Sequence, residues 1–252
     1  MTDIIIQGIN GQMGKVLCDL IEKREDCRVV GGIDITSHSG SIPVAASLEE
    51  LNVPADVVID FSVPTATKAA LRYCERNKIA CVVCTTGLDE ECSQLIMHVS
   101  QSVPVFKSAN MSMGINLVAE LAQKAVQVLG LDYDVEIIEK HHHNKVDSPS
   151  GTALLLADEI NRAADQKYHY VYDRHEIRQK RDPHEIGLHA VRGGSIVGEH
   201  EVLFCGPDEV ITLGHSAGSR AVFANGAINA AVFLKNKKHG LFDMKDLMHS
   251  LL

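Results

Sequence analysis

The sequence predicts an α/β protein, in which a doubly wound parallel sheet is joined to a second, α+β domain with a mixed or antiparallel sheet. Over the first 112 residues, short apolar β-type runs alternate with helical patterns. Such alternation is typical of parallel sheets with right-handed crossovers. After residue 114, three β-type runs follow one another without an intervening helix. Consecutive strands of this kind favour antiparallel or mixed pairing.

The individual elements follow from these patterns. The strands of the first part have continuous apolar interiors, as in a sheet covered on both faces, and are expected at residues 3–7, 28–33, 56–60, 80–84 and 103–107. Helices are expected between them at residues 13–25, 65–77 and 90–100. The second part predicts helices at residues 115–129, 151–164 and 221–234, a short helical tail from residue 243, and strands at residues 134–139, 185–192, 198–205 and 209–215.

Composition and charge exclude several classes of protein. The 252 residues are 45% hydrophobic, enough for a sizeable core and unlike a disordered or collagenous chain. Lys+Arg number 24 against 33 Asp+Glu, a net charge of -9, so we expect neither nucleic-acid binding nor attachment to anionic membranes. No apolar run approaches the roughly 20 residues of a membrane span. An anionic ligand would therefore require a locally cationic cleft.

The chain start and the cysteines indicate a cytoplasmic protein. Residues 3–6 enter an apolar run directly, with no sign of a secretory signal. The chain has seven cysteines, and this odd number suits a reducing compartment. Cys81 and Cys84 form a C-x-x-C pattern within the strand expected at residues 80–84. Strand residues three apart point to opposite faces, so we interpret the pair as buried thiols, not as a redox site.

A glycine-rich turn follows the first expected strand. Gly8, Gly11 and Gly14 have G-x-x-G-x-x-G spacing and open the first helix, as required for a tight turn, close approach to a pyrophosphate and helix–strand packing. Asp34, at the end of the second strand, has the position of a carboxylate that accepts hydrogen bonds from ribose hydroxyls. These features predict a Rossmann-like dinucleotide site, although a simple βα turn remains the alternative. Because Ile35 and Thr36 offer no cation for a 2′-phosphate, the sequence favours NADH over NADPH.

Two further turns follow the carboxyl ends of strands, where a doubly wound sheet holds its ligand. Residues 84–87 (CTTG) follow the fourth strand and residues 108–111 (SANM) follow the fifth. Their small and hydroxylated side chains suit a nicotinamide pocket lined by backbone, but generic loops would look similar.

The segment from residue 139 to residue 152 combines three adjacent histidines and Lys145 with a helix start. Adjacent side chains on an extended segment cannot all face one ion, so no metal site is predicted. A solvated charge run is a second alternative. Residues 148–150 (SPS) are expected to cap the helix, whose first amides, at Gly151 and Thr152, attract an anion. With Lys145 and the imidazoles nearby, the segment predicts a cationic pocket for a small dicarboxylate.

The same segment, residues 136–153 with its string HHxxKxDxPSGT, resembles the signature of the bacterial 4-hydroxy-tetrahydrodipicolinate (dihydrodipicolinate) reductases. The similarity extends over the whole chain and includes the glycine turn, residues 85–87 and 108–112, the RGG and VGEH motifs at residues 192–194 and 197–200, and FANGA at residues 223–227. The resemblance implies NAD(P)H-dependent reduction of 4-hydroxy-tetrahydrodipicolinate, or its dehydrated form, to tetrahydrodipicolinate in lysine and diaminopimelate biosynthesis.

The resemblance also assigns domains and residues. It implies a dinucleotide-binding domain at residues 1–112 and 222–252, and a substrate-binding and oligomerisation domain at residues 113–221 that forms a homotetramer. His141 would be catalytic, Lys145 the proton donor, His142 a substrate-binding residue, and Gly151 and Thr152 the holders of a carboxylate. The implied cofactor-binding residues are Gly8, Ile9, Asn10, Gly11, Gln12, Met13, Asp34, Cys84, Thr85, Thr86, Ser108, Ala109, Asn110 and Met111.

Several positions depart from the family pattern. Gln12 stands where the family often has Arg, Cys84 replaces a usual Gly, Asp34 lacks a following Arg, and Ser148 replaces a common Ala. These changes leave the choice between NADH and NADPH open, with NADH favoured by Asp34. Two other functions remain as alternatives: another two-domain nicotinamide-dependent dehydrogenase of an amino or imino acid, and a dinucleotide sensor without turnover.

Overall fold

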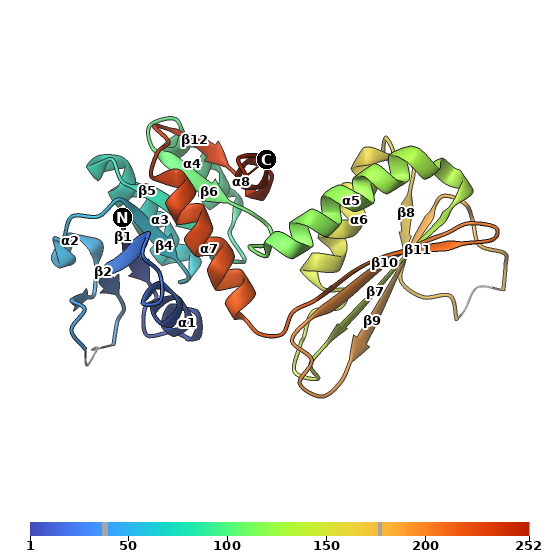
Figure 1. The fold of residues 1–252 in the computed structure, drawn as a ribbon, viewed down its shortest axis with the longest axis horizontal. Coiled ribbons are helices and arrows are strands. Elements are labelled where there is room, and N and C mark those ends of the chain that lie inside the picture. The colour runs from blue at the N-terminus through green and yellow to red at the C-terminus, as the bar shows by residue number, and fades with distance from the viewer. Residues whose placement is uncertain (37–39, 176–177, 252) are drawn as a thin grey trace. The chain divides into compact units, whose positions relative to one another are not determined.

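The computed structural model describes residues 1–36, 40–175 and 178–251, and it has the α/β fold class that the sequence predicts (Figure 1). The chain forms two compact units. Unit 1 consists of Met1–Ser112 and Arg220–Leu252, and unit 2 consists of Met113–Ser219. None of the helices in the described part of the chain has the length and apolar character needed to cross a lipid bilayer.

Unit 1 is built on a seven-stranded sheet in which every pair of neighbouring strands is parallel. The strand order is β12-β6-β5-β4-β1-β2-β3. The strands are β1 (Thr2–Gln7), β2 (Cys27–Ile33), β3 (Val44–Ala45), β4 (Val57–Asp60), β5 (Ala80–Val83), β6 (Pro104–Lys107) and β12 (Gly240–Phe242). The strand order reverses direction between β1 and β4, and ligands of such sheets bind beside the carboxyl ends at that point.

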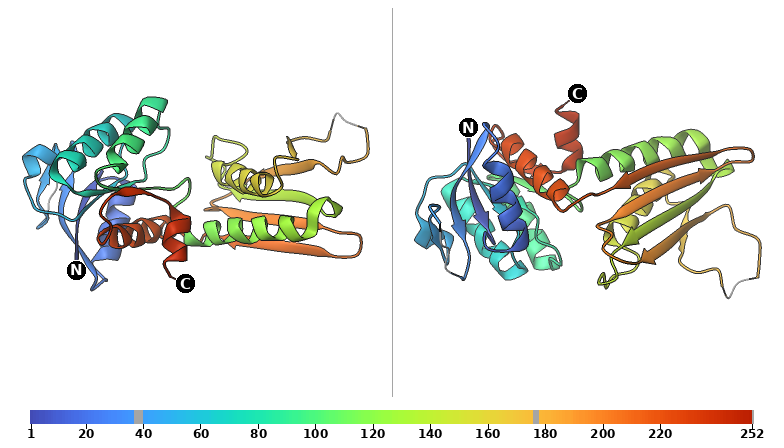
Figure 2. Two further views of the ribbon diagram at one scale, coloured as in Figure 1. Left: turned by 90° about the horizontal axis from the view of Figure 1, so that it is seen from above. Right: turned by 60° about the horizontal axis from the view of Figure 1, so that its bottom comes forward.

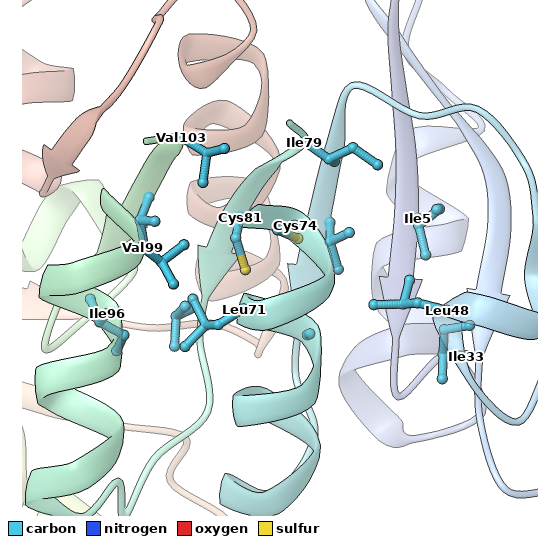
Figure 3. Close-up of a cluster of buried hydrophobic side chains, with 14 of the residues drawn as sticks. Ile5, Ile33, Leu48, Leu71, Cys74, Ile79, Cys81, Ile96, Val99 and Val103 are labelled. Atoms are coloured by element: carbon cyan, nitrogen blue, oxygen red, sulfur yellow. The ribbon is translucent and has the colours of Figure 1, made fainter. Parts of the chain in front are cut away.

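Helices cover both faces of this sheet (Figure 2). They are α1 (Gln12–Ile21), α2 (Leu48–Leu51), α3 (Pro64–Asn77), α4 (Glu90–Ser100), α7 (Ala221–Leu234) and α8 (Met244–His249). α3 and α4 pack on one face, where Leu71, Cys74 and Ile96 meet strand residues such as Cys81 in a buried apolar cluster (Figure 3). α1 and α7 pack together on the other face. The sheet is therefore buried on both sides, as its apolar strands predict.

Several expected boundaries in unit 1 are displaced, and two of them affect the interpretation. The first helix ends at Ile21, not at residue 25, because the next four residues are all charged and bury no apolar side chain. Arg24 instead bonds Asp26 and Asn229. The fourth strand ends at Val83, so Cys84 lies in the following turn and only Cys81 is in the strand. All seven cysteines are free thiols.

Unit 2 has a mixed five-stranded sheet with the order β11-β10-β7-β9-β8. β9 pairs in parallel with β7 and β8, whereas β10 pairs antiparallel with β7 and β11. The elements are α5 (Met113–Leu129), η1 (Gly130–Asp132), β7 (Asp134–His141), α6 (Gly151–Ala163), β8 (His169–Val171), β9 (Glu185–Arg192), β10 (Glu199–Cys205) and β11 (Val210–Ser216). α5 and α6 bury their apolar sides against one face of this sheet. Burial alternates along β7, so its even- and odd-numbered residues face opposite sides.

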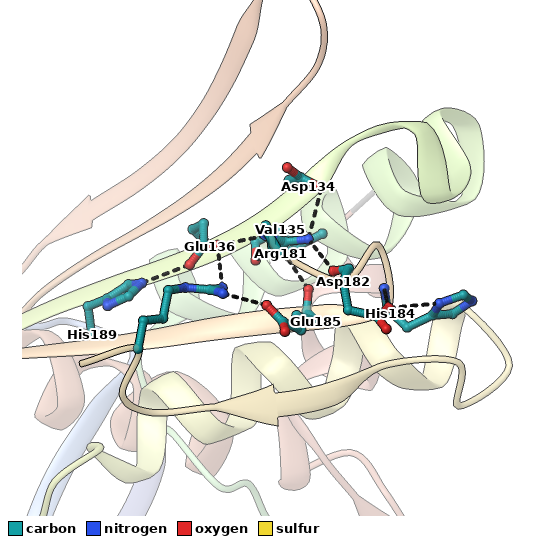
Figure 4. Close-up of polar contacts among 9 residues, drawn as sticks. Asp134, Val135, Glu136, Arg181, Asp182, His184, Glu185 and His189 are labelled. Atoms are coloured by element: carbon teal, nitrogen blue, oxygen red, sulfur yellow. Dashed lines mark hydrogen bonds and ion pairs between the residues drawn. The ribbon is translucent and has the colours of Figure 1, made fainter. Parts of the chain in front are cut away.

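An ionic network lies on the other side of β7 (Figure 4). Glu136 accepts hydrogen bonds from Arg174 at 3.1 Å and Arg181 at 2.9 Å, and its Oε2 lies 2.7 Å from His189 Nε2. Arg174 also bonds Glu185 at 2.5 Å. Burial opposes the charge of Glu136, but His189 and the two arginines hold its pKa below the ordinary value. The network ties Arg174 and Arg181 to the sheet.

Candidate active site

The predicted glycine turn joins β1 to α1 at the carboxyl edge of the unit 1 sheet. Gly8 has a φ of +83°, and a Cβ there would lie 2.6 Å from the carbonyl oxygen of Phe61. A Cβ on Gly14 would lie 2.3 Å from the carbonyl oxygen of Gly8. Only glycine fits both positions. The turn therefore passes very close to the end of β4 and leads directly into α1, whose first amides suit a pyrophosphate.

Asp34 lies just beyond β2, next to this turn. Its carboxylate accepts the Asn10 backbone N–H at 3.1 Å and, from Thr36, the backbone N–H at 3.1 Å and the hydroxyl at 2.8 Å. Partial burial opposes the charge, but the hydrogen bonds from Thr36 and Asn10 outweigh it and lower the pKa of Asp34. Asp34 is thus a charged acceptor beside the glycine turn.

The two predicted turns after β5 and β6 line the same cavity. This cavity has a volume of about 660 Å³ and is lined by Met13, Phe61, Val83, Cys84, Thr85, Thr86, Gly87, Leu88, Lys107, Ser108, Ala109, Asn110, Met111, Arg220 and Phe223. Eight of the predicted cofactor-binding residues line this cavity. Gly8 and Asn10 lie in the glycine turn instead, and Asp34 lies beside that turn. Sequence reasoning missed Phe61, Lys107, Arg220 and Phe223 as candidate ligand contacts. Phe223 belongs to the FANGA motif, which was a usable signal.

Local contacts make the wall of this cavity rigid. The Ser108 hydroxyl donates to the Asn110 carbonyl at 3.0 Å, and Asn110 Oδ1 accepts the Ser112 N–H at 2.8 Å. α7 approaches so closely that a Cβ on Gly226 would lie 1.7 Å from the Met111 carbonyl oxygen. Burial and the nearby charge of Asp60 raise the pKa of the Cys84 thiol, which is therefore a neutral, unreactive lining group.

In unit 2, Glu139 and His141 project from the same side of β7. Glu139 is completely buried, and Arg192 donates to both of its oxygens at 2.7 Å. The Ser150 N–H donates to it at 2.9 Å, and His141 Nδ1 lies 2.6 Å from Glu139 Oε2. Burial alone would raise the pKa of Glu139, but Arg192, His141 and Ser150 hold it below the ordinary value. Sequence reasoning missed both Glu139 and Arg192.

These contacts orient the His141 ring. Because Nδ1 donates to Glu139, Nε2 is the atom available for proton exchange. Gly198 makes room for it, since a Cβ there would lie 3.1 Å from His141 Nε2. The His200 ring packs edge-on against His141, with 5.1 Å between centroids, and its Nε2 lies 3.1 Å from Ser150 Oγ. Burial and the proximity of His141 lower the pKa of His200 to about 4, so His200 is neutral at pH 7.

Lys145 lies in the turn that follows β7. Its backbone N–H donates to the His142 carbonyl at 3.1 Å, and its ammonium pairs with Asp147 at 2.9 Å. Partial burial opposes the charge of Asp147, but bonds from Lys145 and the Gly151 amide keep its pKa below the ordinary value. Lys145, which was predicted to hold a ligand, therefore already pairs with a carboxylate.

α6 begins at Gly151, as predicted, and Ser150 is its N-cap with Oγ accepting the Ala153 N–H at 3.1 Å. Gly151 is exposed, and a Cβ there would meet no atom within 4 Å. Glu139 connects His141 to this helix start, and Lys145 lies in the segment between β7 and α6. The structure thus brings His141, Lys145 and Gly151 to one place, with Thr152 in the first turn of α6. His142 adjoins them in sequence, and its Nδ1 is buried without a partner in the described residues.

A glycine turn beside a carboxylate at the end of the second strand is how doubly wound sheets hold dinucleotides, and unit 2 adds a separate site in which Lys145 accompanies an oriented imidazole. Together they define a two-domain oxidoreductase that uses NAD(P)H. Residues 2–111 match the family model described as dihydrodipicolinate reductase, N-terminus, and residues 114–248 match the model for its C-terminus. The chain belongs to the dihydrodipicolinate reductase family.

Named relatives and a solved structure agree with this family. The chain is 48% identical over 248 residues to the 4-hydroxy-tetrahydrodipicolinate reductase of Caldanaerobacter subterraneus subsp. tengcongensis, with 98% of each chain covered. It is 45% identical to the enzyme of that name from Clostridium tetani, covering 99% of this chain and 98% of the relative. Its structure resembles dipicolinate-bound dihydrodipicolinate reductase from Paenisporosarcina sp. TG-14 with a TM-score of 0.78, 25% identity and coverage of 96% and 97%.

Proposed function

We propose that this protein reduces 4-hydroxy-tetrahydrodipicolinate, or its dehydrated form, to tetrahydrodipicolinate with NADH or NADPH, in lysine and diaminopimelate biosynthesis. The observation that carries the proposal is the unit 2 site, where Lys145 and an oriented His141 adjoin the anion-binding start of α6. An amino acid dehydrogenase or a nucleotide sensor does not need this combination. The names of the relatives support the same reaction.

The cofactor would bind in unit 1. The first amides of α1, at Gln12 and Met13, suit the pyrophosphate beside the glycine turn, Asp34 suits the adenosine ribose, and the cavity lined by residues 84–86 and 108–111 suits the nicotinamide. When bound, the nicotinamide supplies a hydride. The charge of Asp34 repels a 2′-phosphate, and neither Ile35 nor Thr36 compensates it, so NADH is the preferred cofactor.

A substrate carboxylate would bind at the start of α6. Lys145 pairs with the carboxylate of Asp147, which is the same chemical group as those of the substrate, and α6 begins at the exposed Gly151. A substrate carboxylate takes the place of Asp147 there, with Thr152 as a further donor and His142 beside it. The related solved structure, described as dipicolinate-bound, holds an aromatic dicarboxylate, which matches a site for two carboxylates.

Lys145 is the proton donor and His141 assists it. Reduction of the unsaturated ring leaves electron density that requires a proton, and an ammonium freed from Asp147 supplies it. His141 exchanges protons through Nε2, while Glu139 accepts the hydrogen of Nδ1 and stabilises positive charge on the ring. This is the arrangement by which a buried carboxylate supports a catalytic imidazole in other enzymes.

The protein would act as a cytoplasmic homotetramer assembled through the unit 2 sheet. The oligomerisation role that the family resemblance assigns to residues 113–221 supports this proposal. Seven free thiols suit a reducing compartment. Sedimentation analysis tests the assembly, and a monomer at micromolar concentration would contradict it.

The reaction is tested by following NADH oxidation with freshly generated 4-hydroxy-tetrahydrodipicolinate. We expect turnover with this substrate and none with NAD⁺ and a panel of L-amino acids. Turnover with an amino acid instead would establish the dehydrogenase alternative. Binding of NADH without turnover of either substrate would establish the sensor alternative.

A further inference from the structure

Asp60, the last residue of β4, is a completely buried carboxylate that the proposed mechanism does not use. Its Oδ1 accepts the Gln7 side-chain amide at 3.0 Å and the Ser62 backbone N–H at 3.1 Å, and it also accepts the Ser62 hydroxyl. Its Oδ2 accepts the hydroxyls of Thr67 at 2.5 Å and Thr85 at 3.0 Å. All these partners are neutral donors.

Three of these partners belong to consecutive parts of the ligand-binding edge. Gln7 ends β1 and precedes the glycine turn, Ser62 follows β4, and Thr85 follows β5. The three strands are neighbours in the sheet, with Asp60 in register between Gln7 and Val83. A single carboxylate thus joins the segments that leave three adjacent strands.

Thr85 is the partner that lies in the cavity wall. Its hydroxyl donates to Asp60 and accepts the Ser62 N–H at 3.2 Å, so both of its principal hydrogen-bonding functions are occupied. The residue is only 9% exposed, whereas Thr86 is exposed. The Thr85 hydroxyl therefore points into the protein, and residue 85 presents backbone, not its hydroxyl, to a ligand.

We propose that Asp60 is a positioning residue for the cofactor, which fixes the backbone of residues 85–87 and the Phe61–Ser62 segment around the nicotinamide. This inference rests on the proposed NAD(P)H binding in unit 1. A carboxylate suits the role because both oxygens accept, each from more than one donor. In Asp60→Asn, an NH₂ group would replace one carboxylate oxygen and would face other hydrogen-bond donors. Thr85 or Gln7 would then lose its acceptor.

Thr67 provides a matched control, because it donates to the same Asp60 oxygen as Thr85 but lies in α3 and does not line the cavity. Thr67→Val and Thr85→Val each remove one buried hydroxyl from Oδ2. If Asp60 served only to hold the fold together, the two variants would have similar effects on every property.

The experiment measures the dissociation constant of NADH by the enhancement of its fluorescence, which is simplified because the chain contains no tryptophan. Asp60→Asn and Thr85→Val should each raise this constant by about tenfold, the loss expected when a buried polar group loses its partner at the site. Thr85→Ser, which keeps the hydroxyl, should recover most of the affinity. Thr67→Val should lower the melting temperature as Thr85→Val does, yet change the NADH constant by less than about twofold.

Equal effects of Thr67→Val and Thr85→Val on NADH binding would overturn the proposal, as would unchanged NADH binding by folded Asp60→Asn. If Asp60→Asn does not fold, the two threonine variants still decide. The binding assay needs no substrate, so it separates two failures. A wild-type protein that binds NADH without turnover rejects the proposed reaction, whereas turnover with no difference among these variants rejects only the role of Asp60.

Discussion

Two completely buried carboxylates stand near the carboxyl ends of strands, one in each unit, and they have opposite surroundings. Asp60, at the end of β4 in unit 1, accepts hydrogen bonds only from neutral groups, among them Thr85. Glu139, near the end of β7 in unit 2, contacts the cation Arg192 and the titratable ring of His141. The same functional group thus fixes backbone shape in one unit and supports charge in the other.

The different surroundings of the two carboxylates correspond to two kinds of ligand recognition. In unit 1 the cavity is lined by turns with small, hydroxylated and apolar residues together with Lys107 and Arg220, which suits a large anionic cofactor that carries its own reactive group. In unit 2 the site consists of Lys145, His141 and a helix start, which suit a small anion that needs a proton. A chain with a net charge of -9 thus places individual cations at its ligand sites, with Lys145 near α6 and with Lys107 and Arg220 in the lining of the unit 1 cavity.

The proposed contrast between the two units requires that the reaction in unit 2 depend on Lys145. Lys145→Ala should lower kcat by about 10³-fold, within the range for loss of a proton donor, and leave NADH binding almost unchanged. Steady-state kinetics with NADH titration measures both. Lys140→Ala is the matched control, because Lys140 pairs with Glu199 and Glu201 on the other side of β7. Near-normal turnover of Lys145→Ala would reject its role.

The neutral state of His200 gives a second prediction, on stability. Its pKa is lowered to about 4 in the folded protein, below the ordinary 6.5, so the unfolded chain binds the extra proton between these values. Stability should therefore fall as the pH drops from 6.5 to 4, by about 3 kcal/mol from this residue.

Urea unfolding at several pH values measures this loss. His200→Gln should show a flatter pH dependence than the wild type over this window, whereas His239→Gln, which removes an exposed imidazole, should follow the wild type. Parallel curves for His200→Gln and the wild type would contradict the assignment.

Glu139→Gln tests whether the charge of Glu139 supports the reaction, because it removes this charge but keeps the size of the side chain. We expect kcat to fall by roughly 10- to 100-fold, the usual cost of losing a partner that orients a functional imidazole, with the KM for NADH unchanged. Glu136→Gln is the control in the same strand, since Glu136 also contacts arginines and a histidine, His189. A loss of kcat in Glu136→Gln as large as in Glu139→Gln would indicate a general effect on the fold.

The smallest expected effect concerns the carboxylate of Asp34, beside the glycine turn of unit 1. Asp34 should favour NADH over NADPH in kcat/KM by about tenfold. Its repulsion of the 2′-phosphate of NADPH needs to be worth only about 1.4 kcal/mol to give this ratio. Asp34→Asn should reduce the preference, and Asp19→Asn, on the exposed side of α1, should not. A large NADPH advantage in the wild type would reject the interpretation.

Much of the fold follows from local sequence patterns. α4, α7 and β9 have the predicted bounds, since their periodicity and flanking residues are clear. β3, β8 and β12 were missed because strands of two or three residues have no periodicity to detect, and the four-residue α2 was missed for the same reason. These short elements depend on tertiary contacts with neighbouring strands.

The site was predictable where the chemistry is local. Lys145, Ser150 and Gly151 are close in sequence, and their spacing indicates a helix start with a cation beside it. Asp60 and Glu139 were not found because their partners are remote: Thr85 lies 25 residues from Asp60, and Arg192 lies 53 from Glu139. A charged residue within an apolar strand was the available signal, since its burial requires such partners.

The most direct test of this division measures the dissociation constants of NADH and of dipicolinate for the wild type, Asp60→Asn and Glu139→Gln under one set of conditions. Asp60→Asn should weaken NADH by about tenfold and leave dipicolinate unchanged, whereas Glu139→Gln should weaken dipicolinate and leave NADH unchanged. If both variants weaken both ligands to the same extent, the two buried carboxylates do not serve different ligands, and the account is wrong.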